Sequence, residues 1–419
     1  MRKMRDSGIE WVGAIPRDWQ FSKIGSLYTQ RNEKVSDKDY QPLSVTMQGI
    51  LPQLATAAKT DDGDNRKLVR VGDFAINSRS DRRGSCGISP LDGSVSLINI
   101  ILTPRTAMHP GYYNWLFHTT LFADEFYKWG HGIVADLWTT RWQEMKSITV
   151  PVPEYAEQER IAAFLDAECA EIDAVLEKTR ASIEEYKKLK QAVITQAVTK
   201  GIRGDRPMKD SGIEWIGDIP KEWDCKKVKY VTSISRGIFN HRPRNDERYY
   251  GGEYPFIQTG DVAGAQKYIE SYSQTLNELG KSVSKCFPKG TLTMTIAANV
   301  GDAAILGFDA FFPDSVVGFI PNADINDEYL CYIFKAMKPE FVRTAIKSTQ
   351  LNLNVERIRD LFVPVVVQKS EQLEIAEYLN TKCADIDALI AKKQQYLTEI
   401  ENYKKSLIYE YVTGKKEVV

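Results

Sequence analysis

No apolar run in this sequence approaches the ~18–20 residues that a membrane-spanning helix needs. The first thirteen residues carry charges but no apolar core, so they do not have the pattern of a signal peptide. We therefore expect the protein to be cytoplasmic.

Cysteine and histidine are scarce. The six cysteines form no C-x-x-C pair, and the four histidines form no H-E-x-x-H pattern. In a long chain without an export signal, we expect the thiols to be reduced and structural. We expect no metal site.

The sequence also lacks the motifs of common catalytic folds. It has no G-x-x-x-x-G-K-[ST] loop, no G-x-S-x-G turn and no [DN]-P-P-[FY] tetrapeptide of amino-methyltransferases. No glycine-rich turn after a strand is followed by the acidic residue of a dinucleotide or S-adenosylmethionine site. We therefore expect no catalytic residues and no cofactor bound by this chain. The alternative is a catalytic site formed by scattered acids and lysines.

Neither sign of charge is in excess. The chain has 55 Lys and Arg against 56 Asp and Glu, for a formal net charge of −1. A DNA-binding protein often has an overall basic excess, so this balance argues mildly against nucleic-acid binding. A local basic face remains compatible with such a balance. Whether the chain can bind nucleic acid therefore depends on where its charges lie.

The most prominent feature that is present is a repeat. Residues 4–20 (MRDSGIEWVGAIPRDWQ) and 208–224 (MKDSGIEWIGDIPKEWD) are identical at eleven of seventeen positions, and four more are conservative replacements. Such a match, at an offset of 204, indicates a tandem duplication. Four tryptophans recur in it, and we expect them to pack in the core and not to stack on bases: Trp11, Trp19, Trp215 and Trp223.

A second match lies at an offset of 214, between residues 157–174 and 371–388. The middle of the second copy is therefore ten residues longer, and the two middles otherwise differ. Similar ends suggest one shared structural task or one shared partner. Unlike middles suggest two ligands, or two different parts of one ligand.

Two long stretches carry apolar rows at heptad spacing, with no Pro or Gly in residues 154–200 or 365–413. Over four to five heptads this pattern predicts a coiled coil, most simply between the two copies, with helices roughly 60–65 Å long. Thr179, Lys190, Lys393 and Lys404 interrupt the rows, and they either set the register or are merely tolerated. The predicted partner and coiled-coil residues are Leu165, Ile172, Leu176, Ile183, Tyr186, Val193, Leu379, Ile386, Ile390, Leu397, Ile400 and Leu407.

The two middles have the pattern of mixed α/β domains. Short segments rich in β-branched residues and bounded by Gly, Pro, Asp or Asn predict strands, and two longer periodic segments predict helices. V-G-D-F at 71–74 and P-K-G-T at 288–291 predict tight turns leading into strands. The strand segments are 67–77, 94–103, 291–296 and 303–308, and the helices are 112–128 and 327–347.

Each middle contains a basic segment. Residues 77–85 (NSRSDRRGS) hold three arginines, and residues 226–248 hold seven Lys or Arg against two acids. Arginine binds phosphates and guanine edges, and Asn or Gln pairs with adenine, so both segments are candidates for DNA contact. The alternative is a solvated, salt-bridged loop, because Asp81 lies within the first segment. The candidates are Arg79, Ser80, Arg82 and Arg83, then Arg236, Asn240, His241, Arg242, Arg244, Gln258 and Thr259, with Gln350 and Asn352 from a polar segment.

Three pairs of motifs connect the chain with a known family. They are G-x-I-P-x-x-W at 13–19 and 217–223, V-P-V-P-x-x-x-E-Q-x-x-I-A-x-x-L at 150–165 with its echo at 363–379, and the helix ends ITQAVTKG (194–201) and IYEYVTGK (408–415). With them, the chain resembles the specificity subunit of a type I restriction–modification system over essentially its whole length. The echo departs at 365–367, where V-V-V replaces V-P, and this departure bears only on the local turn.

The resemblance implies an α/β fold with two globular mixed α/β target-recognition domains, each followed by a long helix, and the two helices pairing as an antiparallel coiled coil. The implied domains are 1–150 and 204–364, and the implied spacer helices are 151–203 and 365–419. Each domain would read one half of a split, non-palindromic site in double-stranded DNA, and the helices would hold the domains a fixed distance apart.

The resemblance also implies partners. The helix ends would dock two modification subunits that carry S-adenosylmethionine and methylate adenine N6, and restriction subunits that translocate DNA could join them. The rival interpretation is a coiled-coil scaffold that binds only proteins and does not read DNA. A single-chain nuclease or methyltransferase is a third interpretation.

Overall fold

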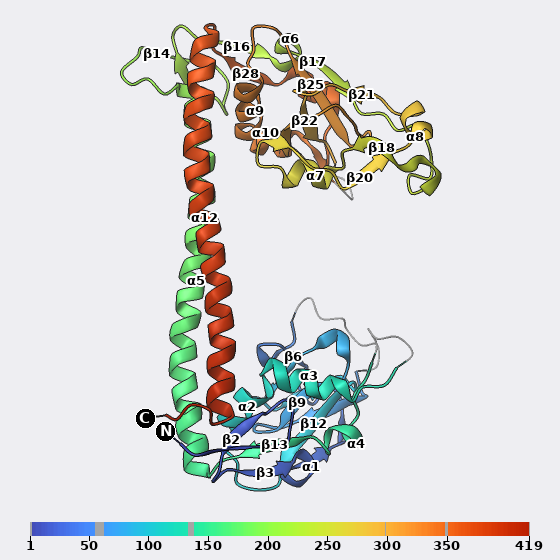
Figure 1. Cartoon of the computed structure of the whole chain (residues 1–419), viewed down its shortest axis with the longest axis vertical. Coiled ribbons are helices and arrows are strands. Elements are labelled where there is room, and N and C mark those ends of the chain that lie inside the picture. Colours follow the sequence, from blue (N-terminus) through green and yellow to red (C-terminus); the bar gives the residue numbers. More distant parts are fainter. Residues whose placement is uncertain (1, 55–62, 133–137, 298, 348–350, 419) are drawn as a thin grey trace. The chain divides into compact units, whose positions relative to one another are not determined.

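The computed structural model describes residues 2–54, 63–132, 138–297, 299–347 and 351–418. The chain forms two compact units: unit 1 contains Met1–Arg180 and Gln394–Val419, and unit 2 contains Ala181–Lys393. Two long helices, α5 (Tyr155–Lys200) and α12 (Lys369–Val412), contribute residues to both units (Figure 1). Both helices begin within a few residues of where the sequence predicts them.

Unit 1 is built around a four-stranded antiparallel sheet in the order β10-β9-β12-β4. Its strands are β4 (Tyr28–Arg31), β9 (Phe74–Asn77), β10 (Cys86–Ile88) and β12 (Asn99–Pro104). Helices α2 (Pro110–Phe117) and α3 (Thr120–Lys128) cover it with aromatic side chains. The rings of Phe74 and Phe117, for example, have centroids 4.5 Å apart.

Smaller antiparallel pieces complete unit 1. The single-turn helices are α1 (Ile24–Leu27) and α4 (Trp142–Met145). The strand pairs are β1 (Met4–Asp6) with β2 (Ala14–Pro16), β3 (Gln20–Lys23) with β13 (Thr149–Val152), and β6 (Leu43–Thr46) with β7 (Gly49–Pro52), and a three-stranded sheet contains β11 (Gly93–Val95), β8 (Arg66–Val69) and β5 (Lys34–Val35).

Unit 2 contains a five-stranded sheet in the order β17-β25-β22-β23-β19. Its strands are β17 (Thr232–Arg236), β25 (Val316–Pro321), β22 (Leu292–Thr295), β23 (Ala303–Leu306) and β19 (Tyr268–Ile269). A second sheet, β20-β18-β24-β21, is formed by β18 (Tyr250–Phe256), β20 (Gln274–Leu276), β21 (Cys286–Phe287) and β24 (Ala310–Phe311).

The remaining elements of unit 2 are short, apart from α9. The strand pairs are β14 (Met208–Asp210) with β15 (Asp218–Pro220), β16 (Asp224–Lys227) with β28 (Phe362–Val365), and β26 (Ile346–Lys347) with β27 (Leu351–Asn352). The helices are α6 (Val228–Val231), α7 (Thr259–Gly264), α8 (Glu278–Ser282), α9 (Asp327–Ala336), α10 (Lys338–Thr344), α11 (Val355–Asp360) and the 3-10 turn η3 (Glu247–Tyr249).

The two middles share a sheet that their unlike sequences do not reveal. The antiparallel order β4-β12-β9-β10 of unit 1 recurs as β17-β25-β22-β23 in unit 2. A glycine with positive φ precedes the matched inner strand in both, Gly72 (87°) and Gly290 (85°), so the two predicted tight turns are present. The second sheet of unit 2 and the three-stranded sheet of unit 1 are the parts that differ.

The predicted strand segments contain strands, but 67–77 and 94–103 hold two strands each, and each predicted helix is two helices. In unit 1 the Thr119 side chain accepts a hydrogen bond from Phe122 N and so caps α3 as a new helix. In unit 2 Pro339 occupies the second position of α10, where it has no N–H to donate into a continuing α9. The segment predicted as helix up to residue 347 ends in β26.

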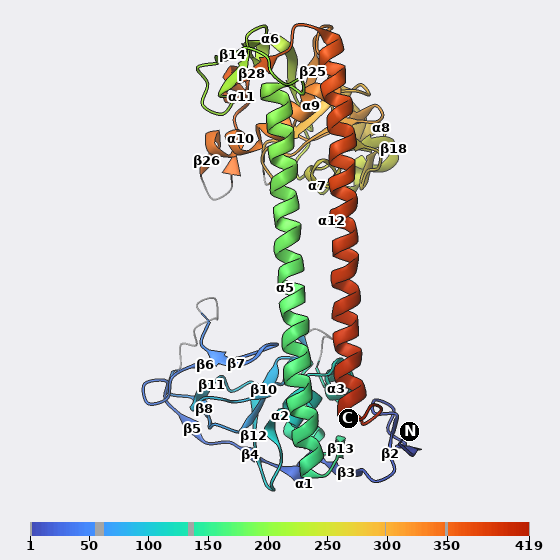
Figure 2. The same ribbon diagram turned by 90° about the vertical axis from the view of Figure 1, so that its left-hand side faces the viewer.

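Within each unit the two long helices run antiparallel, side by side (Figure 2). In unit 1 Lys404 Nζ lies 2.6 Å from the Asp173 carboxylate, and in unit 2 Lys190 Nζ lies 2.6 Å from the Asp387 carboxylate. Asp173 and Asp387 are equivalent positions in the two copies, and so are Lys190 and Lys404, because the members of each pair are 214 residues apart. Each lysine therefore pairs with the aspartate of the other copy's helix. The predicted antiparallel coiled coil is confirmed.

The predicted seam positions differ in burial. Six are buried and six are half-buried, so the apolar rows face partly inward and partly onto the surface of the helix pair. The buried residues are Leu165, Leu176, Ile183, Leu379, Ile386 and Leu407, and the half-buried ones are Ile172, Tyr186, Val193, Ile390, Leu397 and Ile400.

The repeated Glu-Gln pair explains why the start of each long helix is similar in both copies. Glu157 accepts hydrogen bonds from Arg2 and from Trp19 Nε1, at 3.0 and 2.9 Å, and Glu371 accepts one from Arg206 at 2.6 Å. Both carboxylates are therefore paired with an arginine from the N-terminal end of their own copy. This is the shared structural task that the repeat predicts.

The glutamine of the pair attaches each long helix to the N-terminal end of a helix of its own domain, α2 in unit 1 and α9 in unit 2. Gln158 Oε1 accepts from His109 N at 2.9 Å, and Gln372 Oε1 accepts from Asn326 N at 2.8 Å. His109 and Asn326 are the residues that precede α2 and α9, so the contact is the same in both units. Each glutamine amide also donates to the strand end before its own helix, at Pro153 O or Val366 O.

The recurring tryptophans pack, as predicted. Trp11, Trp19 and Trp223 are buried, and the half-buried Trp215 donates from Nε1 to Phe362 O at 3.2 Å.

Candidate nucleic-acid interface

The arginine loop of unit 1, residues 77–85, leaves the end of β9 and contains the 3-10 turn η1 (Ser80–Arg82). Ser80 N donates to Trp138 O at 2.9 Å, and the Tyr127 hydroxyl donates to Asn77 O at 2.9 Å. Two separate segments thus hold the loop backbone, so its side chains are presented from an anchored turn.

The four predicted residues of this loop, Arg79, Ser80, Arg82 and Arg83, lie together on it. The Asp81 carboxylate lies 3.9 Å from the Arg79 guanidinium and 3.8 Å from that of Arg82, and Asp124 pairs with Arg83. Exposed pairs of this kind contribute only about 0–1 kcal/mol each, so a phosphate could replace the carboxylates at small cost. The salt-bridged alternative therefore describes the free loop, and DNA contact stays a prediction.

A hollow of about 500 Å³ beside this loop adds residues that the sequence did not single out. Arg79 lines it together with Gln30, Lys67 and Arg141. Lys67 Nζ donates to Asn99 O at 2.6 Å, and burial lowers the pKa of this lysine. The lining comes from β4, β8 and the residue before α4, which are too far apart in the chain for any local pattern to group them.

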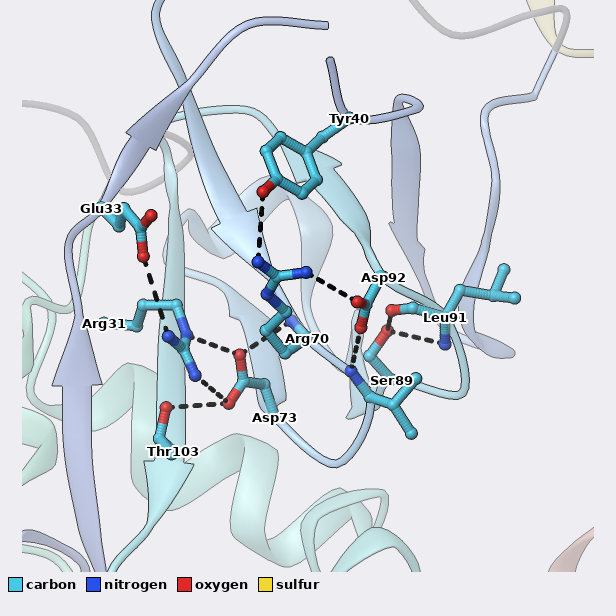
Figure 3. Close-up of polar contacts among 10 residues, drawn as sticks. Arg31, Glu33, Tyr40, Arg70, Asp73, Ser89, Leu91, Asp92 and Thr103 are labelled. Carbon is cyan, nitrogen blue, oxygen red and sulfur yellow. Dashed lines mark hydrogen bonds and ion pairs between the residues drawn. The ribbon is translucent and has the colours of Figure 1, made fainter.

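A second polar cluster of unit 1 belongs to the fold (Figure 3). The buried Asp73 carboxylate accepts from Arg31 Nε and Thr103 Oγ1, each at 2.8 Å, and from Arg70 N at 2.9 Å. It therefore joins β4, β12 and the turn before β9. The Arg70 guanidinium binds Asp92 at 2.8 Å. Since Arg31 is half-buried and paired with a buried carboxylate, we assign it to stability, whereas Arg70 and Asp92 form a partly exposed pair.

In unit 2, three predicted arginines converge on one acid. Arg242 and Arg244 both bind the Asp314 carboxylate, the former at 3.3 Å, and Arg236 Nε donates to the Asp314 backbone oxygen. Asp314 lies seventy or more positions away in the chain, and no local signal in the sequence could have identified it. The arginine segment is thereby held in a folded loop, and the guanidiniums of Arg242 and Arg244 are about half exposed.

Asn240 and His241, also in this segment, differ in their surroundings. Asn240 is exposed, and its backbone N donates to Val283 O at 3.1 Å. The His241 ring stacks on Tyr249 with centroids 3.9 Å apart and lies 3.0 Å from the Asp246 carboxylate. A hydrogen bond from Arg248 is the main cause that holds the pKa of Asp246 well below its usual value. The His241 ring thus packs within the loop, and its contact with DNA stays a prediction.

Gln258 and Arg244, predicted from separate segments, are brought to one pocket of about 240 Å³. Gln258 Nε2 donates to Gln274 Oε1 at 2.8 Å, and Asn245 and Gln274 complete the polar lining. Thr259 is the first residue of α7 and does not line this pocket. Gln274 is the residue that sequence reasoning missed.

The polar segment near residue 350 cannot be placed in full. Gln350 lies outside the described residues. Asn352 belongs to β27, where its backbone pairs with Ile346. Its side chain is not described.

Two negative findings concern the described part of the chain. Its His, Cys, Asp and Glu residues form no cluster of three or more that could hold a metal ion. Within the same described residues, no helix combines the length and the apolar character needed to cross a membrane.

Comparison with known proteins places part of the chain in a family. Residues 220–401 match the family model described as the type I restriction modification DNA specificity domain. The chain is 30% identical over 187 residues to the type I restriction enzyme MjaIX specificity subunit of Methanocaldococcus jannaschii, a match that covers 43% of this chain and 41% of that one. It is 24% identical over 286 residues to the MjaVIII specificity subunit of the same organism, covering 65% and 63%.

The matches thus span less than two thirds of these relatives. A solved structure on complex assembly and conformational transition of the type I R-M system contains a chain with a TM-score of 0.74, at 14% identity, covering 96% of this chain and 99% of that chain. This likeness supports the same fold for the two chains.

Proposed function

We propose, from the match of residues 220–401 to the type I restriction modification DNA specificity domain, that the chain is a non-catalytic subunit that reads the two halves of a bipartite site in double-stranded DNA. The family match is the single observation that carries this proposal. The match falls on the second copy of the repeat, and the first copy has the same sheet order. Each copy would therefore be one reading domain.

The basic segments support two different reading surfaces. In unit 1 the arginine loop follows β9, whereas in unit 2 the arginine segment follows β17, the counterpart of β4. Equivalent sheets thus carry their exposed guanidiniums at different strand ends. Such domains are suited to unlike half-sites, since phosphate contacts position a protein and the local side chains at base edges specify the sequence.

The test is methylome sequencing of a host that carries the locus. A bipartite adenine-methylated motif should be present, and it should disappear when this gene alone is deleted. Persistence of the motif after deletion would contradict the proposal.

The rival function is a coiled-coil scaffold without DNA readout. DNA binding by neutralised phosphates has an affinity that falls steeply with salt, and a scaffold has no such dependence. Titration of the chain, in complex with its partners, with duplex DNA at two salt concentrations separates the two. No salt-dependent affinity would favour the scaffold.

Docking of two modification subunits is the finer part of the proposal, and the helix pair of unit 1 offers a surface for one. A groove of about 340 Å³ is lined by apolar and aromatic residues of both helices together with Glu168 and Glu171. Val175, Tyr396 and Tyr403 in it are 39, 48 and 54% exposed. Apolar side chains gathered on one face of a soluble protein mark an interaction surface.

Two of the corresponding positions of unit 2 are also apolar and exposed, whereas Tyr396 corresponds to the polar Ser182. At the offset of 214, Val175 corresponds to Leu389, and Leu189 corresponds to Tyr403. Leu389 is 41% and Leu189 is 48% exposed. A surface that recurs in both units while the reading domains differ is what two copies of one partner need.

The stoichiometry of the purified complex tests this docking. Tyr403→Asp should remove one of two modification subunits, Leu189→Asp should remove the other, and the double variant should leave none, as measured by native mass spectrometry. Leu279→Asp is the matched control, because Leu279 is 48% exposed but lies on α8. Retention of both subunits by the double variant would refute this surface.

S-adenosylmethionine would be bound by the modification subunits, with no cofactor on this chain, and the complex would act in the cytoplasm. Restriction subunits that translocate DNA would complete it where the host encodes them.

A further inference from the structure

The pocket of unit 2 combines an aromatic wall with a polar rim. Phe239, Phe256 and Tyr250 form the wall, with ring centroids of Phe239 lying 5.3 Å from Phe256 and 5.8 Å from Tyr250. The two phenylalanines are buried and Tyr250 is half-buried, so the wall is part of a small core cluster and is rigid. The volume of about 240 Å³ lies just below the roughly 300–1,000 Å³ of sites for drug-sized ligands, which leaves room for one ring system.

The rim carries three amides and a guanidinium. Gln258 and Gln274 are joined by the 2.8 Å hydrogen bond from Gln258 Nε2, which fixes the Gln274 amide. Gln258 itself is held at the start of α7, where its backbone N donates to Asp261 at 2.7 Å. Among the described residues, no partner contacts the Gln274 Nε2 or the amide of the exposed Asn245. These groups are available to a ligand.

Arg244 links the pocket with the basic segment. Its guanidinium is held by Asp314, and its backbone oxygen accepts a hydrogen bond from the Tyr250 hydroxyl of the wall. The pocket therefore lies at the edge of the surface where Arg236 and Arg242 are placed around the same acid. A phosphate bound by these arginines would bring the attached nucleotide next to the amides.

We propose that this pocket reads one base of the half-site bound by unit 2, through hydrogen bonds from Asn245 and Gln274 to the edge of that base. The inference rests on the proposed DNA-reading function and adds a site to it. Asn and Gln side chains pair bidentately with N6 and N7 of adenine, so adenine is the complementary base. The face of the base packs against the aromatic wall.

The experiment compares the methylated motif of the wild-type complex with those of Gln274→Leu and Asn245→Ala, by methylome sequencing. Each variant should relax one position of one half-site, with about tenfold less discrimination for adenine there, while the other half-site stays unchanged. Asn245 is exposed, so its truncation leaves folding intact even if Gln274→Leu does not fold. Gln266→Leu is the matched control, because this exposed glutamine of unit 2 does not line the pocket.

Three outcomes overturn the pocket proposal. A motif unchanged by both variants would refute the pocket and leave the DNA-reading function standing. Relaxation in both half-sites would also refute it. Binding of free adenosine monophosphate, with the motif unchanged, would indicate a small-molecule site. The absence of any methylated motif in the wild-type complex would instead contradict the proposed function itself.

Discussion

Asp73 illustrates at the residue scale how the domain separates charges for stability from charges for binding. Its carboxylate is buried and accepts hydrogen bonds from a side-chain guanidinium, a hydroxyl and a backbone N–H. The arginines of the loop 77–85 are instead exposed and weakly paired. Local sequence identified the exposed arginines, since they are adjacent in the chain, but could not distinguish Arg31 as structural.

Replacing Asp73 should therefore cost stability. In Asp73→Ala the half-buried Arg31 is left without its main acceptor, and we expect the free energy of unfolding of unit 1 to fall by about 2–4 kcal/mol. Hydrogen exchange of peptides from β9 and β12 measures this decrease locally. Asp92→Ala is the control, because Asp92 is 48% exposed in its pair with Arg70 and should change exchange little. Equal effects of the two variants would contradict the assignment.

His118 gives unit 1 a predicted pH dependence. Burial is the main cause that lowers the pKa of this histidine from its usual 6.5, while its Nδ1 lies 2.6 Å from Asn114 O. The unfolded chain therefore takes up a proton at a higher pH than the folded one, so the stability contributed by the neutral ring is present above pH 6.5 and is lost as the pH falls below it. Urea denaturation at pH 7.5 and 5.5 measures this, and His118→Gln should flatten the difference. If the variant kept the wild-type difference in the free energy of unfolding between the two pH values, His118 would not be the source of that difference.

At the scale of elements, the long helices follow their sequence closely and the short elements do not. The helices α5, of forty-six residues, and α12, of forty-four, form because their heptad rows contain no Pro or Gly and repeat the same helical preference over many turns. The breaks between α2 and α3, and between α9 and α10, depend on a single capping residue or a single proline. The apolar periodicity of the whole segment does not reveal them. The shared sheet order of the two middles depends on strand pairing between distant segments.

Two of the lysines that interrupt the heptads, Lys190 and Lys404, pair with aspartates across the seam, and this supports a role in register. Lys190→Asp would place two carboxylates opposite each other at a site where both side chains are about a quarter exposed. We expect unit 2 to lose about 1–2 kcal/mol, and the charge swap Lys190→Asp with Asp387→Lys to recover most of it. Thermal unfolding followed by circular dichroism measures both. Lys188→Asp, at a 74% exposed side chain, is the control. Failure of the swap to recover stability would mean that the lysine is merely tolerated.

At the scale of the whole molecule, the repeat predicts that damage to one reading domain spares the other. Replacing Arg82 and Arg83 with Ala should weaken selection at one half-site of the methylated motif. The slope of DNA affinity against salt should fall by about one for each phosphate that the variant no longer binds. The control is Lys188→Ala on α5, outside both basic segments. Equally weakened selection at both half-sites would contradict the division of reading between the units.

The sequence by itself determined the duplication, the two long helices and the mixed α/β character of the middles, because repeats and heptads are local and repeated signals, whereas the antiparallel pairing of the helices was implied by the family resemblance. It also showed the resemblance to the family whose model matches residues 220–401. Only the tertiary structure decided which charges are paired and which are presented. Asp314 gathers Arg242 and Arg244, and Gln274 meets Gln258, across long separations in the chain. Such contacts depend on strand pairing and packing between distant segments, which no local pattern encodes.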